Sequence, residues 1–470
     1  MEFNAESLGR FFIATSATIL ISGCAVTSVF NPYPNQARSY QSAMVDGSVP
    51  HNAAASDAVL LDLSEDRESA DAMLYMMERG RIAQVNSKFE ESKQDFQLVI
   101  DKFEQQDLAS TIEASDVGAK SASMLTNDNA IPYSGAGYER IFTHHHQALN
   151  YWGLGDVEGA SIEFRKVALE QQILLEKYEA EIAEAQQEAE ENDFDVSTVS
   201  NEFVGLDTIA GQVKSSFQNA YTFYTSAAFW EAIGELNNAL VDYKKAYEIN
   251  PSVDMIKQDI ARVSKRLGTS VSTKDLNMPA EDEGTVVLLF EDGFVPAKSE
   301  MKISLPTFDG GIVSVAFPTY EPELWSRAIS LKVLDDNFTD YGLTHPLADV
   351  GVLAVKDLKE QLPAIAVRQA LRAFAKYAMQ KQSGEHLGLA GALVANLYNV
   401  FSESADRRSW LTLPNSAQGL RINLPKGARE LSLSAGVAQT RLQLEIEPKK
   451  TTFVRVVHVN NQLIPQIFKI

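Results

Sequence analysis

The stretch from Phe223 to Pro251, FYTSAAFWEAIGELNNALVDYKKAYEINP, constrains the fold more than any other part of the chain. Apolar and small residues recur along it at the spacing of a helix face. Gly234 interrupts this pattern, and Ala239 is small where two helices would cross. The pattern therefore predicts two short helices that pack against each other across a turn at Gly234.

This stretch resembles a tetratricopeptide repeat, a unit of two antiparallel helices. The residues that carry the resemblance stand at the offsets of that repeat: Trp230, Gly234, Ala239, Tyr243, Ala246 and Pro251. Two other stretches fit the template more loosely, HHHQALNYWGLGDVEGASIEFRKV and MMERGRIAQVNSKFEESKQDFQLV. Their spacing departs from the usual period of about 34 residues. Other helices must therefore lie between the units, among them the acidic stretch from Glu170 to Glu191.

Repeats of this kind bury one face against their neighbours and leave a concave surface for peptides or proteins. Aromatic side chains on that surface are the natural contacts for a partner. The candidate partner-binding residues are Tyr151, Trp152, Tyr221, Tyr224 and Trp230. The repeat template assigns Tyr151 and Trp230 to the helix core, so only part of this set can face a partner.

The composition of the sequence changes near Thr269, where a polar and acidic linker begins. Alternating segments then predict strands, starting with GTVVLLFEDGFVPAKSEMKISLP around a hairpin turn at Glu291-Asp292-Gly293. Two helical segments follow, the first with a break or kink at Pro363, and strands return after them. This order predicts an α+β domain with one mostly antiparallel sheet, partly covered by helices.

Two segments of this domain each allow two structural interpretations. In ADRRSWLTLP, the residues Asp406, Arg407, Arg408 and Trp410 are a candidate C-terminal site that could fix a carboxylate or stack on a ring. The alternative, which we favour, is an internal salt bridge that holds a helix end on the sheet. The apolar segment from Gly388 to Phe401 is either a buried core helix, which we favour, or a membrane-inserting or self-associating hairpin.

Metal and enzymatic sites are harder to find in the sequence. His144, His145 and His146 are adjacent on a predicted helix, where neighbouring side chains point about 100° apart, so we expect no metal site and no cofactor. A hydrolase acting on polysaccharide or cell wall is the enzymatic alternative. Its candidate residues are scattered and follow no motif: Glu291, Asp292, Asp309, Asp349 and Asp406, with His345.

The N-terminus explains the single cysteine. A short apolar run after Arg10 fits a secretory signal and is too short to span a bilayer. It ends in Ile21-Ser22-Gly23-Cys24, which resembles the lipobox of bacterial lipoproteins. The resemblance implies cleavage before Cys24, acylation of that residue and, because Ala25 follows it, delivery to the outer membrane. The formal net charge of −22 disfavours nucleic acid as a partner.

Taken together, these pieces predict a signal peptide (1–23), a lipidated tether (24–58), a helical repeat domain (59–268), a linker (269–284) and an α+β domain (285–470). Their order resembles a family of bacterial repeat-containing lipoproteins without established enzymatic activity. The resemblance supports this architecture and the envelope address. The repeats and the lipid anchor together favour a non-enzymatic envelope scaffold that faces the periplasm and binds a periplasmic or outer-membrane protein through its repeats, for example in cell-wall synthesis or in secretion or appendage assembly. The alternatives are the hydrolase and a membrane-associating oligomeric component.

Replacing Cys24 tests the anchor directly. The thiol sulfur is the atom that accepts the diacylglycerol, so we expect Cys24→Ala to abolish acylation and to release the protein from the membrane fraction. Intact-mass measurement and membrane fractionation check this. A variant that remains acylated, or equally membrane-bound, would refute lipidation at this residue.

Overall fold

The computed structural model describes residues 32–49, 51–113, 131–191, 195–269, 278–306, 311–325, 327–402 and 404–470. The signal peptide and Cys24 lie outside these residues.

The second half of the expected tether is helical: α3 (Tyr33–Asp46) and α4 (Ala53–Glu65) precede the short helix η1 (Asp66–Glu68). Pro34 stands in the first turn of α3, where a missing N–H costs nothing, and Tyr33, Ala37 and Tyr40 are buried. From Tyr33 onward the expected tether is therefore mostly helical and packs on the helix that follows, Ala72–Val85.

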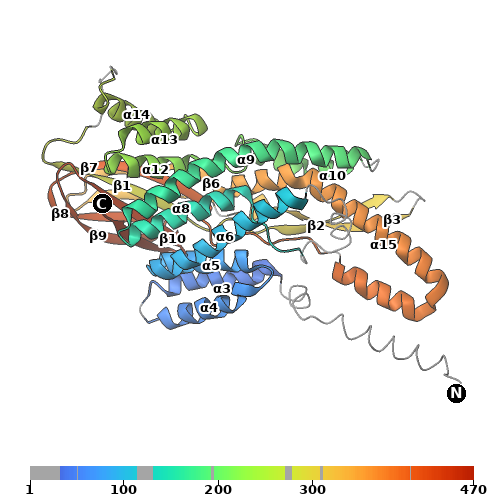
Figure 1. Cartoon of the computed structure of the whole chain (residues 1–470). Coiled ribbons are helices and arrows are strands. Elements are labelled where there is room, and N and C mark those ends of the chain that lie inside the picture. Colours follow the sequence, from blue (N-terminus) through green and yellow to red (C-terminus); the bar gives the residue numbers. More distant parts are fainter. Residues whose placement is uncertain are drawn as a thin grey trace.

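Three helical hairpins follow, at the places that the repeat pattern predicts (Figure 1). They pair α5 (Ala72–Val85) with α6 (Phe89–Glu113), α8 (Gly137–Gly153) with α9 (Val157–Glu191), and α12 (Ala220–Ala232) with α13 (Leu236–Ile249). The helix α14 (Asp254–Arg266) packs on α13. Short helical turns separate the second and third hairpins and explain the irregular period: α10 (Ser197–Ser200), η3 (Asn201–Leu206) and α11 (Asp207–Ala210).

The three hairpins share one turn. Its central residue has a positive φ: 60° at Ser87, 78° at Gly155 and 88° at Gly234. The next residue's N–H then bonds back to a carbonyl in the preceding helix at 2.8 Å, as Glu235 does to Trp230. The predicted turn at Gly234 is confirmed.

The strands form three sheets. The five-stranded sheet has the order β11-β10-β1-β7-β6, with β1 parallel to β10 and the other neighbours antiparallel. The four-stranded sheet has the order β5-β4-β8-β9, and β2 and β3 form a separate hairpin. The bounds are β1 (Glu283–Asp292), β2 (Ser299–Pro306), β3 (Ile312–Thr319), β4 (Lys332–Asp335), β5 (Asp340–Leu343), β6 (His345–Asp349), β7 (Ser416–Pro425), β8 (Gly427–Ala435), β9 (Ala438–Ile446), β10 (Thr451–Val459) and β11 (Gln462–Phe468).

The α+β class is therefore right, and three details of the prediction are wrong. The strands of the described residues form three sheets, where we expected one. The chain leaves β1 at Gly293 without folding back on it, because β1 is the middle strand and its two edges pair with β7 and β10. The two expected helices are one element, α15 (Val350–Ser402), which contains Pro363. A proline removes one helical hydrogen bond and can be tolerated where packing holds the helix.

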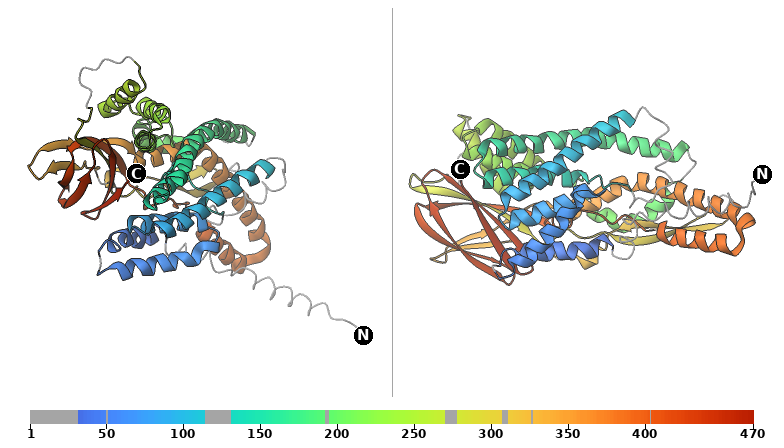
Figure 2. Two further views of the ribbon diagram at one scale, coloured as in Figure 1. Left: turned by 60° about the vertical axis from the view of Figure 1, so that its left-hand side comes forward. Right: turned by 60° about the horizontal axis from the view of Figure 1, so that its bottom comes forward.

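The five-stranded sheet is the middle layer of the molecule. Alternate residues of β1 face opposite sides: Val286, Leu288 and Phe290 join the core shared with the four-stranded sheet, whereas Val287 and Leu289 join the core shared with the helices. Figure 2 shows most strands gathered on one side of the molecule and the repeat helices on the other. The inner faces of the repeats therefore pack on this sheet.

A substitution at Gly284 in β1 tests how tightly this layer is packed. A β-carbon there would lie 2.4 Å from the backbone oxygen of Glu447, which cannot move away without disturbing the strand connection. We expect Gly284→Ala to lower the free energy of unfolding by about 1–3 kcal/mol. Gly205, with open space around it, is the matched control. Equal thermal unfolding of the two variants would contradict this packing.

Candidate functional site

The aromatic residues expected to line an open groove are mostly buried. Trp152 and Trp230 are 2% exposed, Tyr221 and Tyr224 are 0% exposed, and Tyr151 is half-buried. The indole N–H of Trp152 donates to the Lys469 carbonyl oxygen at 3.2 Å, and its ring packs on Phe453 at 4.4 Å between centroids. The prediction of an exposed aromatic groove is therefore wrong for Trp152, Tyr221 and Tyr224, because the chain's own sheet covers them. Trp230 is buried among the repeat helices, where the repeat template assigns it.

A buried ionic cluster joins the repeats to the sheet at β1. Both guanidinium groups of Arg81 and Arg455 contact the Glu291 carboxylate, and the Tyr221 hydroxyl donates to it at 3.1 Å. All four side chains are 1% exposed or less. Arg455 also donates to Gln84 at 2.9 Å. The negative charge of Glu291 thus holds α5, α12, β1 and β10 together.

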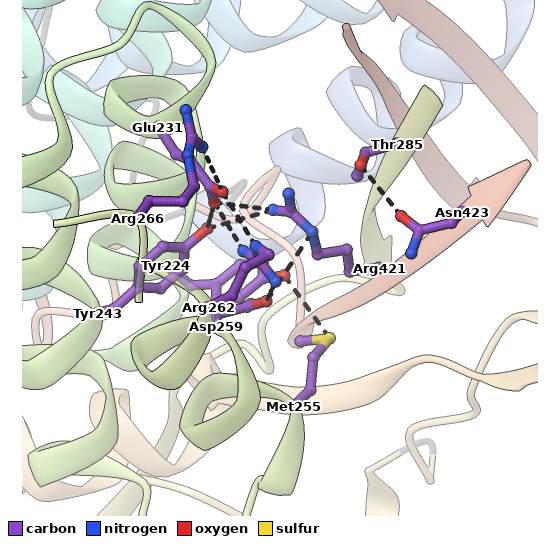
Figure 3. A network of polar contacts seen from close by, with 10 residues as sticks. All are labelled: Tyr224, Glu231, Tyr243, Met255, Asp259, Arg262, Arg266, Thr285, Arg421 and Asn423. Atoms are coloured by element: carbon purple, nitrogen blue, oxygen red, sulfur yellow. Dashed lines mark hydrogen bonds and ion pairs between the residues drawn. The ribbon is translucent and has the colours of Figure 1, made fainter. Parts of the chain in front are cut away.

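A second cluster joins α12 and α14 to β7 (Figure 3). Arg262 donates to Glu231 at 2.6 Å, and Arg421 donates to the same carboxylate at 3.1 Å. Arg266 approaches it as well, at 3.1 Å. Burial alone would raise the pKa of Glu231, but Arg421 and Arg262 outweigh it and hold that pKa well below its usual range. This carboxylate is structural.

The carboxylates considered for hydrolysis are also held in structural contacts. Glu291 is in the first cluster, and Asp292 pairs with His458 at 2.7 Å. Asp349 accepts the Val352 N–H at 2.9 Å, at the start of α15. Asp309 lies outside the described residues, and His345 is exposed at the start of β6. Among the described candidates, no side-chain hydrogen bond or ion pair joins one to another.

The ADRRSW segment forms internal contacts, as in the alternative that we favoured. Arg408 donates to Asp406 at 2.7 Å, to Asp71 before α5 at 2.6 Å and to the Ile131 carbonyl oxygen at 3.0 Å. Trp410 is fully buried, and its backbone N–H donates to Glu139 at 2.8 Å. Arg407 is half-buried. The segment therefore connects the α+β domain to α5 and α8 of the repeats. We had expected its ion pair to hold a helix end on the sheet instead.

Asp406 and Arg408 also line a polar cleft of about 180 Å³ between the two domains, which we call the junctional cleft. Its other walls are the loop 131–136 before α8, Lys298 and Pro318 of the β2–β3 region, and Asp357, Gln361, Ile365 and Arg368 of α15. The Lys298 ammonium donates to the Arg408 carbonyl oxygen at 3.3 Å, and the Gln361 amide donates to Asp357 at 3.0 Å.

The junctional cleft contains both signs of charge within one cavity. Burial raises the pKa of Asp357 to about 7, and Lys298 partly opposes this rise. A cavity with cationic, anionic and amide groups can bind a ligand that has donors and acceptors of its own, such as a peptide segment. Lys298 and Asp357 are residues that the sequence analysis missed, because single polar residues on a strand end and a helix carry no pattern.

Comparison with known proteins leaves the function open. No protein-family model matches the chain, and no curated protein matches it. The TPR2AB domain of yeast Sti1, solved as a complex with pHSP90, is similar at 13% identity and a TM-score of 0.19, over 48% of this chain and 84% of that chain. A TM-score this low carries no argument. The predicted lipoprotein family therefore has no family match behind it.

The segment from Gly388 to Phe401 belongs to the last part of α15, and its side chains lie outside the described residues. Among the helices described, none combines the length and the apolar character that a bilayer crossing requires. These findings do not test the choice between a core helix and a membrane-inserting or self-associating hairpin.

Asp357 makes stability depend on pH. Below pH 4 it is protonated in both states. Between pH 4 and about 7 the unfolded state ionises while the folded state keeps its proton, so stability falls as pH rises, by about 1.4 kcal/mol for each unit of pKa difference. We expect Asp357→Asn to raise the melting temperature at pH 8 and to change it little at pH 4. The exposed Glu445→Gln is the control; an equal effect of both variants at pH 8 would refute the assignment.

Proposed function

We propose that the protein is a non-enzymatic, lipid-anchored scaffold of the bacterial envelope that binds a segment of a periplasmic or outer-membrane protein in the junctional cleft. The observation that carries this proposal is the cleft itself. Both domains build it, and its walls hold Lys298, Asp357 and Gln361 beside an internally paired Asp406 and Arg408.

The binding surface differs from the one that the repeat pattern predicted. The inner faces of the repeats are filled by the chain's own sheet, so a partner cannot reach Trp152, Tyr221, Tyr224 or Trp230 in this conformation. The cleft lies instead where the loop 131–136, at the start of the second hairpin, meets α15 and the β2–β3 hairpin. Partner recognition therefore uses residues of both domains at once.

The arrangement of charges supports a binding role over a catalytic one. In the described residues, Asp406 is paired with Arg408, and Glu291 is enclosed by two arginines. A hydrolase needs one carboxyl group to give up a proton and another to attack or to activate water. Carboxylates held by arginine at both oxygens are poorly suited to either role, because their charge is already neutralised.

Crosslinking in living cells tests the proposal, with Cys24→Ala as the unanchored control. We expect one envelope protein to be recovered at high yield with the anchored form. Lys298→Glu should reduce that yield at least tenfold, because it reverses the charge of a cationic group in the cleft. The matched control is Lys302→Glu, an exposed lysine on the same hairpin.

Two results would overturn this function. Equal recovery with Lys298→Glu and Lys302→Glu would place the partner outside the cleft. Recovery of no protein above the unanchored control would remove the stable scaffold altogether. Thermal unfolding of both variants shows beforehand that each is folded.

A further inference from the structure

The three adjacent histidines of α8 face three different environments. His144 turns toward α9, where its Nδ1 lies 2.7 Å from a Glu163 carboxylate oxygen. His145 packs against Tyr221 at 5.2 Å between centroids, and His146 packs against Trp410 at 5.7 Å. The rings of His145 and His146 are 5.4 Å apart. These two residues, unlike His144, point into the interior between the repeats and the sheet.

The imidazole nitrogens of His145 and His146 are buried and unpaired. Both residues are 0% exposed, and none of the four ring nitrogens has a hydrogen-bond partner among the described residues. A neutral imidazole has one N–H donor and one nitrogen lone pair, and buried polar groups of this kind are normally satisfied. The lone pair of such a ring is the group that binds a metal ion.

The third group comes from the other domain. A carboxylate oxygen of Glu291 and one nitrogen of each ring all lie within 4.8 Å of one another. We propose that His145, His146 and Glu291 form a binding site for a divalent transition-metal ion of the Zn²⁺ type. Two imidazole nitrogens and a carboxylate oxygen are a ligand set that such ions prefer. Bonds of about 2.1 Å would bring the ligand atoms to about 3.4 Å from one another.

Sequence reasoning missed this site for a definite reason. It considered the helix alone, where neighbouring side chains point about 100° apart. The structure supplies the third ligand from β1, far along the chain, and turns two adjacent rings toward it.

Arg81 is the group that competes with the ion. It contacts Glu291, its Nη1 has no partner among the described residues, and its Nε bond to the Thr412 carbonyl oxygen is long at 3.4 Å. Arg455 is better held, by Glu291 at 2.9 Å and by Gln84 and Gln466 at 2.9 and 3.1 Å. A bound ion would therefore compete with Arg81 for Glu291 and leave Arg455 in place, and its binding energy must offset the cost of leaving the buried Arg81 without that partner.

The test uses the full-length protein, solubilised in detergent. Because the site is buried, the protein is unfolded with chelator, refolded without metal or with Zn²⁺ or Co²⁺, and freed of excess ion. We expect one ion per chain by elemental analysis and, with Co²⁺, visible absorption bands of a low-coordinate site. His146→Phe keeps an aromatic ring against Trp410 and should lose the ion. His144→Gln, on the same helix, should keep it.

Arg81→Met provides the second measurement. If the ion and Arg81 compete for Glu291, removing the guanidinium should tighten Zn²⁺ binding at least tenfold while His146→Phe still abolishes it. No ion retained after refolding in metal would overturn the proposal. The same ion content in His146→Phe and the wild type would also overturn it, since the ion would then bind elsewhere. Failure of this site leaves the scaffold proposal untouched, because none of its three ligands lines the junctional cleft.

Discussion

The Glu291 carboxylate is the group on which the union of the two domains depends. It is fully buried and shared between Arg81 of a repeat helix and Arg455 of the neighbouring strand. Removing such charges from water costs several kcal/mol for each ion, and only close contacts between all partners offset that cost. Losing one partner leaves an unpaired buried charge, which destabilises a protein by about 3–5 kcal/mol. The geometry of α5, β1 and β10 is therefore fixed by electrostatics as well as by apolar packing.

Buried carboxylates of the repeats also bind the loop 410–412 of the α+β domain. Glu78 of α5 accepts the backbone N–H groups of Leu411 and Thr412 at 2.7 and 3.1 Å, and Glu139 of α8 accepts that of Trp410. Burial raises the pKa of Glu78 to about 7, although the bonds from Thr412 and Tyr33 oppose this. Two repeat helices thus bind a loop of the α+β domain through its backbone, as a repeat surface would bind a separate peptide.

The sequence predicted the parts of this structure that depend on local patterns. Each helical hairpin was found from small residues at crossing points, and the Gly234 turn from a residue that tolerates positive φ. The strands of the C-terminal half were found from alternation. Their pairing was not, because the parallel contact of β1 with β10 joins segments about 165 residues apart in the sequence. Alternation predicts a strand and says nothing about its neighbour.

The candidate sites were less predictable, for the same reason. Trp152 and Tyr221 fit an exposed groove in the repeat template, but the template cannot show that a sheet of the same chain fills the groove. Arg408 was correctly given an internal ion pair as its favoured role, while its main partner outside the loop, Asp71, lies 337 residues away. Lys298 and Asp357 meet at the cleft only after three distant segments have packed.

The filled repeat surface also argues against treating the two halves as separate modules. Cutting the chain at the linker would expose Trp152, Phe453 and Phe468, which pack together across the domain boundary. It would also leave Arg455 and Glu291 without Arg81, and Glu78 without the N–H groups that satisfy it. Each half would then carry both an apolar patch and buried charges opened to water. The repeats and the α+β domain are thus one cooperative unit, and the junctional cleft exists only when both are folded together.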